Sequence, residues 1–436
     1  MTAARSVAQP SRVDAPLRIR SIISGTIGNA VEYYDWFVYS AFSIYFAKSF
    51  FPSGSQTAQL LNSAAVFAAG FLMRPIGGWA LGLYADRHGR KAALLASVLA
   101  MCLGSLVIGL TPGYATIGVA APVILVCGRI VQGFSLGGEY ASSATYLSEM
   151  ASPGSRGYYS SFVFATLSVG QLLALLVLVV LQQFFLTSEQ LYSWGWRIPF
   201  IIGALLAVVA IYLRGTMVET ASFLERGRDR RSRTGVRELS RHWRACLTVV
   251  GLTFGGAIAF YAYTTYIQKF LVNTAGMDKA TATLISTVAL TGFIMLQAPL
   301  GALSDRIGRR PLLLTFGVLG CVCTVPIFTA LSTVASPIRA LALLMAGQFI
   351  VSLYSSVSAV AKAEIFPVHV RALGVGMPYA LTIALFGGSS EYVALWLKAH
   401  GHESYFYWYV SAAIGVSLVT YLFASESRLI SHIDSD

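Results

Sequence analysis

A ten-residue pattern occurs twice in the sequence, as GLYADRHGRK at residues 82–91 and as GALSDRIGRR at residues 301–310. The second copy begins about half of the 436-residue chain after the first. Each copy is a short basic turn with an aspartate and two glycines, and each lies between long apolar runs. Recurrence at this spacing is typical of a duplicated helical membrane protein.

The composition agrees with this interpretation. Hydrophobic residues make up 56% of the chain and charged residues 11%, whereas an average soluble protein is about 25% charged. The net charge of +12 lies largely in short loops, where it sets membrane topology, so nucleic acid is not an expected partner. The five cysteines lie in or beside apolar runs, and neither a disulfide nor a metal site is expected.

About 20 apolar residues suffice to span a bilayer. Twelve stretches meet this length, at residues 20–50, 57–84, 91–111, 119–149, 157–185, 196–218, 243–274, 279–303, 311–332, 338–365, 372–399 and 405–425. Arginine and lysine are concentrated in alternate loops and at the chain ends. The positive-inside rule therefore places both termini in the cytoplasm.

The predicted fold is an all-α membrane protein with twelve transmembrane helices in two six-helix bundles. An approximate two-fold axis along the membrane normal should relate the bundles, with a polar cavity between them. The predicted domains are a disordered cytoplasmic tail (1–19), the first bundle (20–218), a cytoplasmic linker (219–242), the second bundle (243–425) and a cytoplasmic tail (426–436).

Longer motifs indicate the family. The repeated pattern resembles the loop between the second and third helices of major facilitator superfamily transporters, which recurs between the eighth and ninth. The stretches VFAAGFLMRPIGGW (66–79), WGWRIPF (194–200), YIQKFLVNTAGM (266–277) and FGGSSEYVAL (386–395) are similar to those of the metabolite–proton symporter family. The resemblance covers nearly the whole chain and is greatest to carriers of 2-oxoglutarate (α-ketoglutarate).

Charges at the expected cytoplasmic helix ends repeat at the same offset in both halves. They resemble the inner gate of the superfamily, in which carboxylates pair with arginines of the repeated loop when the cytoplasmic side is closed. The gate residues implied are Asp86, Arg90, Glu149, Arg156, Asp305, Arg309, Glu364 and Arg371. The alternative is that these charges only solvate helix ends.

Four charged residues lie deep in predicted spans, where an unpaired charge costs several kcal/mol. They are Glu32 and Asp35 in the first span, Arg74 in the second and Arg129 in the fourth. Glu32 and Asp35 are three residues apart and share one helical face. An inert ion-pair lock between helices is the alternative to a functional site.

Proton coupling would need a carboxylate, because no histidine lies within a predicted span. In proton–sugar symporters of the superfamily an acid of the first helix pairs with an arginine of the fourth, and Asp35 and Arg129 match these positions. Glu32 with Arg74 is the second candidate pair. Lys362, Lys269, Glu391 and Glu139 are less central, and Lys362 can be explained as a helix-end residue that snorkels.

The polar side chains near these charges are candidate substrate ligands, because amides, hydroxyls and guanidinium groups orient small polar substrates. They are Arg74, Arg129, Tyr33, Gln132, Gln171, Tyr263 and Tyr266. Packing in the helical core is the alternative explanation for the tyrosines. Gly133 and Gly137 are predicted points of close helix contact.

The resemblance implies a monomeric secondary transporter of a bacterial inner membrane that takes up 2-oxoglutarate or a related dicarboxylate with protons. Its partners would be a small anionic metabolite, protons and the bilayer, with no cofactor and no catalytic residue. Alternatives are another metabolite, such as citrate, shikimate or a zwitterionic osmolyte (proline or betaine), and a receptor that binds without transport.

The GFSLG stretch at 133–137 matches a serine hydrolase pattern, but it lies in a predicted membrane helix without a histidine partner. No ATP-binding loop pattern occurs.

Overall fold

The structure is a computed structural model that describes residues 15–88, 90–151, 154–215, 236–424 and 426. Long helices dominate these ranges, and no β-strand occurs within them. Most of the predicted linker and tails lies outside the described residues. At the start, α1 runs from Ala15 to Phe50, so residues 15–19 are helical and not part of a disordered tail. Pro16 is compatible with this start, since a first-turn residue needs no backbone N–H donor.

The N-terminal half follows the predicted order of spans. After α1, its long elements are α2 (Gln56–Leu72) with α3 (Arg74–His88), α4 (Arg90–Leu110), α6 (Ala120–Ser135) with α7 (Glu139–Met150), α8 (Arg156–Val180) and α10 (Ile198–Gly215). Two short helices, α5 (Tyr114–Ile117) and α9 (Ser188–Ser193), lie in the loops between them.

The C-terminal half repeats this order after the short α12 (Val236–Arg241). Its elements are α13 (Trp243–Tyr261) with α14 (Ile267–Asn273), α15 (Lys279–Ile307), α16 (Arg310–Ser332), α17 (Pro337–Ala363), α18 (Val368–Thr382) with α19 (Ser390–Ala399), and α20 (Ser404–Phe423). Single turns of π-helix join α13 to α14 (η4, Ala262–Tyr266) and α18 to α19 (η5, Ile383–Gly387).

Twelve membrane-spanning segments account for this helical content. Nine helical stretches among the described residues are long and apolar enough to cross a bilayer. Leu95–Leu110 and Gly195–Val209 are shorter apolar helices, and α1 is the first span. The predicted all-α fold of two six-helix bundles is therefore confirmed.

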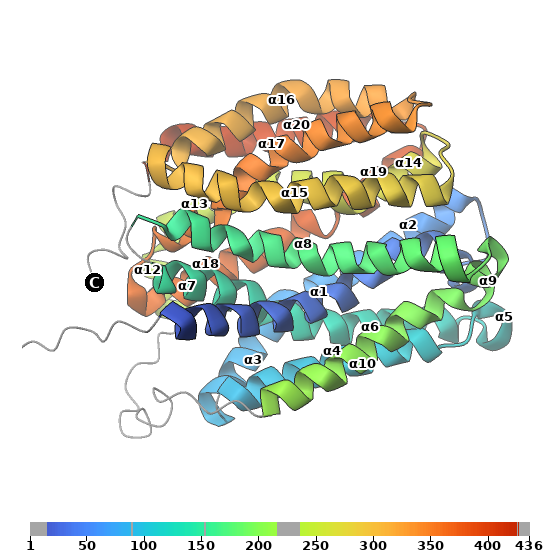
Figure 1. Ribbon diagram of the computed structural model, residues 1–436, viewed down its shortest axis with the longest axis horizontal. Coiled ribbons are helices and arrows are strands. Elements are labelled where there is room, and N and C mark those ends of the chain that lie inside the picture. Colours follow the sequence, from blue (N-terminus) through green and yellow to red (C-terminus); the bar gives the residue numbers. More distant parts are fainter. Residues whose placement is uncertain (1–14, 89, 152–153, 216–235, 425, 427–436) are drawn as a thin grey trace, which may run out of the picture.

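The two halves meet along two seams. α8 packs along α15, and α2 packs against α19. Figure 1 shows α8 and α15 side by side in the middle of the molecule, with α16, α17 and α20 on one edge and α3, α4 and α10 on the other. The α8–α15 seam joins the fifth span of the N-terminal half to the second span of the C-terminal half. The α2–α19 seam joins the second span of the N-terminal half to the fifth span of the C-terminal half, as an approximate two-fold relation between the halves requires.

Glycines bring α2 and α3 close to the fourth span. A Cβ atom on Gly133 would lie 1.9 Å from the carbonyl oxygen of Gly70, and one on Gly77 would lie 1.9 Å from that of Phe134. Backbones at this distance leave no room for a side chain, which is the usual role of small residues between membrane helices. The close contact predicted at Gly133 is thus present, and it fixes Arg74 against the core of the N-terminal half.

Replacing Gly133 with alanine should lower the Tm of the purified protein. The added methyl group must displace the Gly70 backbone, and overpacking of this kind costs about 1–3 kcal/mol. Gly138→Ala is the matched control, because nothing lies within 4 Å of its Cβ position. Thermal unfolding in detergent measures the difference, and equal Tm values for the two variants would contradict the close approach.

Candidate functional site

Two guanidinium groups lie against the indole ring of Trp36 in α1. The guanidinium carbon of Arg129 is 3.8 Å from the ring centroid, and that of Arg74 is 4.2 Å from it. Trp36 and Arg129 have no exposed surface, and Arg74 is 6% exposed. Two cations in one buried place repel each other strongly because the local dielectric constant is low. The site therefore favours a ligand of negative charge.

The hydrogen bonds of these two arginines are incomplete. Arg129 Nη1 donates to Gln132 Oε1 at 2.8 Å and to the carbonyl oxygen of Trp36 at 3.3 Å. Nε and Nη2 of Arg129, and the same atoms of Arg74, are buried and have no hydrogen-bond partner in the described part of the chain. Buried donors are nearly always satisfied in proteins. These donors can therefore bind a carboxylate, which guanidinium groups bind in bidentate fashion.

A chain of hydrogen bonds connects Arg129 to Asp35. Gln132, which accepts from Arg129, donates through Nε2 to Ser105 Oγ at 2.9 Å. Ser105 Oγ in turn donates to Asp35 Oδ1 at 2.7 Å. Each donor along this chain points toward the carboxylate. The charge on Asp35 consequently influences how firmly Gln132 holds the guanidinium.

The sequence predicts that Asp35 faces Arg129 directly, and the structure differs. No ion pair joins them in this conformation, and Asp35 Oδ2 has no hydrogen-bond partner among the described groups. Successive residues of an α-helix point about 100° apart, and it is Trp36 that faces Arg129. Asp35 points toward α4 and α10, where a Cβ on Gly203 would lie 1.7 Å from its Oδ1.

Glu32 and Tyr33 lie one turn before Trp36 and are also buried. The Tyr33 hydroxyl is within electrostatic range of Arg74 and Glu32. The Arg74 guanidinium additionally lies 4.2 Å from the ring centroid of Phe71. The structure thus brings Glu32, Tyr33 and Arg74 into one neighbourhood beside Trp36.

The remaining predicted substrate ligands lie elsewhere. Gln171 of α8 donates to the carbonyl oxygen of Thr264 at 2.9 Å and so ties the two halves together. Tyr263 packs against Phe328 at 4.9 Å between ring centroids, and Tyr266 packs against Phe406 at 5.4 Å. Both tyrosine rings therefore pack inside the C-terminal half, and the structure does not bring them to the two arginines. A π-turn changes which residues face the seam, and its position could not be read from sequence.

A buried ion pair of the C-terminal half, between two residues that were expected to be less central, contacts the N-terminal half through Ser40. Lys269 Nζ of α14 is 2.6 Å from Glu391 Oε1 of α19 and donates to Ser40 Oγ of α1 at 2.7 Å. Lys269 is 1% exposed and Glu391 3%. Glu391 is within electrostatic range of Arg129. Their positions inside apolar spans marked Lys269 and Glu391 as candidate functional residues in the sequence. Only the fold shows that these two side chains form an ion pair.

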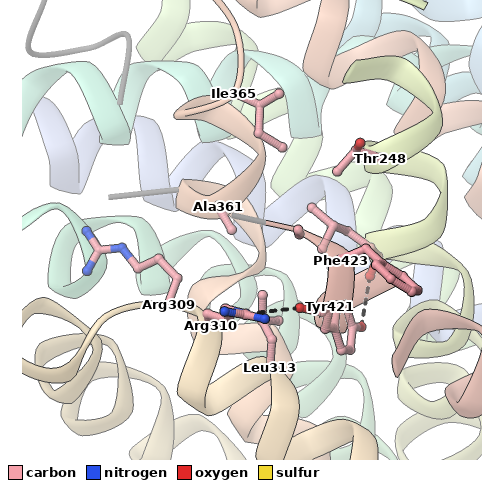
Figure 2. Close-up of a pocket in the computed structure, with 10 residues that line it drawn as sticks. Thr248, Arg309, Arg310, Leu313, Ala361, Ile365, Tyr421 and Phe423 are labelled. Atoms are coloured by element: carbon pink, nitrogen blue, oxygen red, sulfur yellow. Dashed lines mark hydrogen bonds between the residues drawn. The ribbon is translucent and has the colours of Figure 1, made fainter. Parts of the chain in front are cut away.

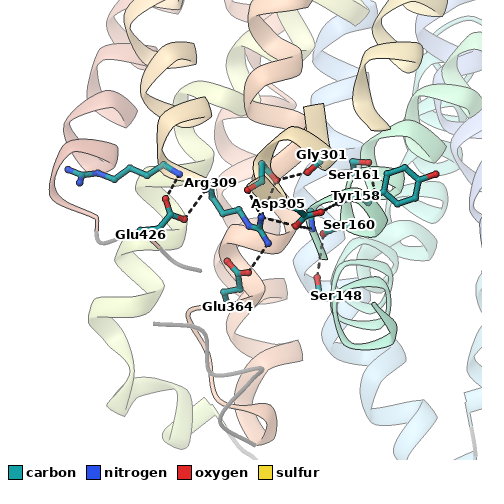
Figure 3. Close-up of polar contacts among 12 residues, drawn as sticks. Ser148, Tyr158, Ser160, Ser161, Gly301, Asp305, Arg309, Glu364 and Glu426 are labelled. Carbon is teal, nitrogen blue, oxygen red and sulfur yellow. Dashed lines mark hydrogen bonds and ion pairs between the residues drawn. The ribbon is translucent and has the colours of Figure 1, made fainter. Parts of the chain in front are cut away.

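A second charged cluster lies at the end of the molecule that carries the repeated basic loop, called here the basic end. Arg309 Nη1 is 2.9 Å from Asp305 Oδ1, and its Nη2 is 3.2 Å from Glu364 Oε1. Asp305 also accepts from the backbone N–H groups of Gly157 and Tyr158, at 2.8 and 2.9 Å. Figure 3 shows these contacts crossing from α15 to the start of α8. The second copy of the loop thereby ties the two halves together.

The other predicted gate residues are placed only in part. Arg156 and Arg371 are buried, and Arg371 Nε donates to the carbonyl oxygen of Phe366 at 3.1 Å. Glu426 accepts from the backbone N–H groups of Arg309 and Arg310, at 2.8 and 2.9 Å, which suits the start of α16. The side chains of Asp86, Arg90 and Glu149 lie outside the described residues.

The halves are also in contact at the opposite end. Asn273 Nδ2 donates to Thr57 Oγ1 at 3.2 Å, and Lys279 Nζ donates to the carbonyl oxygen of Ile44 at 3.1 Å. Lys279 Nζ lies 4.2 Å from the ring centroid of Tyr192. With contacts at both ends and buried charges between them, this conformation holds the arginine pair away from solvent.

A cavity of about 270 Å³ lies near the basic end but within the C-terminal half alone. It lies between α13, α16, α17 and α20, and Figure 2 shows Arg310, Tyr421 and Phe423 on its wall. Arg310 is held there by hydrogen bonds to the carbonyl oxygens of Tyr421 and Leu422, at 3.3 and 2.6 Å. This cavity is distinct from the arginine pair on Trp36.

Comparisons with known proteins agree with this arrangement. The chain is 52% identical over 409 residues, 94% of each chain, to a protein of Escherichia coli named alpha-ketoglutarate permease. It is 35% identical to the citrate-proton symporter of Salmonella typhi, again over 94% of each, and 31% identical to the proline/betaine transporter of Escherichia coli over 88% of this chain and 78% of that one. The resemblance to metabolite–proton symporters is confirmed.

Solved structures show the same fold. The xylose transporter XylE of Escherichia coli, in a partially occluded inward-open conformation, superposes with a TM-score of 0.72 at 19% identity, covering 94% of this chain and 97% of that one. The family model described as Major Facilitator Superfamily matches residues 25–390. The chain is thus a multi-pass membrane transporter and belongs to the Major Facilitator Superfamily.

Proposed function

We propose that this protein is a proton-coupled symporter that takes up 2-oxoglutarate or a related small dicarboxylate by alternating access. The observation that carries the proposal is the pair of buried guanidinium groups on Trp36, with donors that have no partner among the described residues. An anion with two carboxylates would offset their repulsion and complete their hydrogen bonds. The 52% identical relative is named for this substrate.

The arrangement favours a dicarboxylate over a zwitterionic osmolyte. A quaternary ammonium group needs free aromatic faces around it. The faces of Trp36, Phe71 and Tyr39 are already covered by the arginines, at 3.8 to 4.6 Å from guanidinium carbon to ring centroid. Citrate remains the second candidate, because a citrate–proton symporter is 35% identical and a larger polyanion would meet the same charges.

Proton coupling would operate through the chain from Arg129 to Asp35. With Asp35 ionised, the hydrogen bonds from Ser105 and Gln132 are at their strongest and hold the guanidinium in place. Protonation removes the charge that orients the chain and loosens Gln132 from Arg129. The guanidinium can then bind the substrate carboxylate. Proton and substrate therefore favour each other's binding, which is the linkage that symport needs.

Alternating access would open the two ends in turn around this fixed site. At the basic end, opening must separate Asp305 from the backbone of Gly157 and Tyr158. The carboxylate also holds Arg309, so it acts on both sides of the seam. We propose that this cluster is the inner gate, and that Arg156, Arg371 and the first-loop residues Asp86, Arg90 and Glu149 complete it.

The proposal includes topology and assembly. The start of α1 and the end of α20 lie at the same end of the molecule as Arg306, Arg309 and Arg310 (Figure 1), and loops rich in arginine favour the cytoplasm. Both termini would then be cytoplasmic in a bacterial inner membrane. We further propose a monomer without a cofactor or enzymatic activity.

Uptake into proteoliposomes with an inward proton gradient tests the function. We expect 2-oxoglutarate to accumulate above its external concentration, and succinate, citrate, shikimate, proline and betaine to compete less well. Collapse of the gradient with a protonophore should stop accumulation. Transport that is indifferent to the gradient, or that prefers proline or betaine, would overturn the proposal.

Asp35→Asn should retain substrate binding and counterflow exchange but lose accumulation, because the amide keeps the shape without a titratable proton. Arg129→Ala should instead weaken binding itself, by about 2–5 kcal/mol if a buried charge contact is lost. Glu189→Gln, at an exposed position of α9, is the control for an acid-to-amide change. If Asp35→Asn accumulates substrate like the parent, Glu32 becomes the proton carrier to test.

Asp305→Asn should open the basic end more often, because the amide loses the charge that holds Arg309 and the start of α8. A cysteine introduced at Ser161, next to Gly301 on the α8–α15 seam, reports opening by its rate of maleimide labelling. We expect labelling to become several-fold faster. Asp278→Asn at the exposed opposite end of α15 is the control, and equal rates in both variants would contradict the gate.

A further inference from the structure

Lys362 is buried in a cage of tyrosines. Its Nζ lies 4.6, 5.4 and 5.7 Å from the ring centroids of Tyr379, Tyr140 and Tyr354. It donates to Ser358 Oγ at 2.8 Å and to the hydroxyls of Tyr140 and Tyr354 at 3.3 and 3.4 Å. The side chain has no exposed surface. The snorkelling position suggested by the sequence is therefore wrong.

The Lys362 amine has no carboxylate partner among the described residues. The other buried lysine of the seam, Lys269, has Glu391 at 2.6 Å. Lys362 forms no ion pair with a carboxylate in the described ranges of the chain. Hydroxyl dipoles and aromatic faces stabilise a cation only in part, and a buried charge is usually paired. A carboxylate that entered the cage would therefore supply the partner that the lysine lacks among the described residues.

The cage is built from both halves. Lys362, Ser358 and Tyr354 come from α17 and Tyr379 from α18, whereas Tyr140 comes from α7 of the N-terminal half. The rings of Tyr140 and Tyr379 stack across the seam with their centroids 3.4 Å apart and 9° between their planes. Because this stack covers the lysine, separation of the halves at the basic end would uncover it.

Tyrosines also connect the cage to the arginine pair. Tyr379 is within electrostatic range of Tyr33 and Tyr261, and both of these are within range of Arg74. The ring of Tyr261 packs on that of Phe71 at 5.2 Å, which itself lies under Arg74. Tyrosine side chains of both halves therefore lie near Arg74 and beside Lys362.

We propose that Lys362 binds one carboxylate of the substrate, while the arginine pair on Trp36 binds the other. The inference rests on the proposed dicarboxylate function and adds the ligand of the C-terminal half. In the bound state the hydroxyls of Tyr140 and Tyr354 turn to donate to the carboxylate. A dianion then contacts cations of both halves, so binding draws the halves together, whereas a monoanion cannot do this.

The test is binding of 2-oxoglutarate and its two monomethyl esters to purified protein, measured by calorimetry. Lys362→Gln should bind the diacid about 10- to 100-fold more weakly, the loss expected for one charge-assisted contact. For the monoester in which the carboxylate that contacts Lys362 is blocked, Lys362→Gln and the parent should have equal affinity. Lys362→Arg should recover part of the affinity. Lys398→Gln, which removes a partly exposed lysine paired with Glu403, should leave all three affinities unchanged.

Parent affinity of Lys362→Gln for the diacid would overturn the inference, as would equal weakening for the diacid and both esters. If the parent itself does not prefer the diacid to either ester, the proposed dicarboxylate function fails instead. Tyr140→Phe provides an independent variant should Lys362→Gln not fold. It should weaken the diacid selectively, and an unchanged preference for the diacid would also contradict the assignment.

Discussion

The repulsion between two guanidinium groups on one buried indole ring is the constraint on which the centre of this transporter depends. Arg129 and Arg74 lie 3.8 and 4.2 Å from the Trp36 centroid, in a place where charge interactions are screened very little. The electron-rich ring attracts both cations, but it cannot neutralise them. The surrounding structure therefore has to supply negative charge from Glu32, Asp35 and Glu391 or receive it from a bound anion.

The groups around the two arginines partly offset the repulsion between them. Ser105 and Gln132 carry the influence of the Asp35 charge to Arg129 without direct contact. Glu391 forms an ion pair with Lys269, so its negative charge is largely neutralised by that lysine. The donors of the two arginines that have no partner among the described residues are the physical basis of the proposed anion site, and the Asp35 chain is the proposed route by which a proton affects it.

Sequence patterns predicted much of the fold because they depend on properties local to the chain. The length of the apolar runs located the spans, the repeated loop located the two halves, and Gly133 marked a close helix contact that is present. Charges inside spans correctly singled out Arg74 and Arg129 as buried.

What sequence could not predict depends on how each helix is rotated and where it is interrupted. Asp35 and Trp36 are neighbours, yet only Trp36 faces Arg129. The π-turn of η4 coincides with the placement of Tyr263 and Tyr266 inside the C-terminal half. Lys362 contacts Tyr140 and Lys269 pairs with Glu391, and each partner lies on another helix. Residue spacing along the sequence does not predict contacts of this kind.

If proton and anion bind cooperatively at one buried site, substrate binding must be accompanied by proton uptake. Calorimetric titration of the purified protein with 2-oxoglutarate, repeated in buffers of different ionisation enthalpy, measures that uptake. We expect a binding enthalpy that varies with the ionisation enthalpy of the buffer, in the direction that shows protons taken up by the complex. A binding enthalpy that is the same in every buffer, across a pH range in which substrate binds tightly, would contradict it.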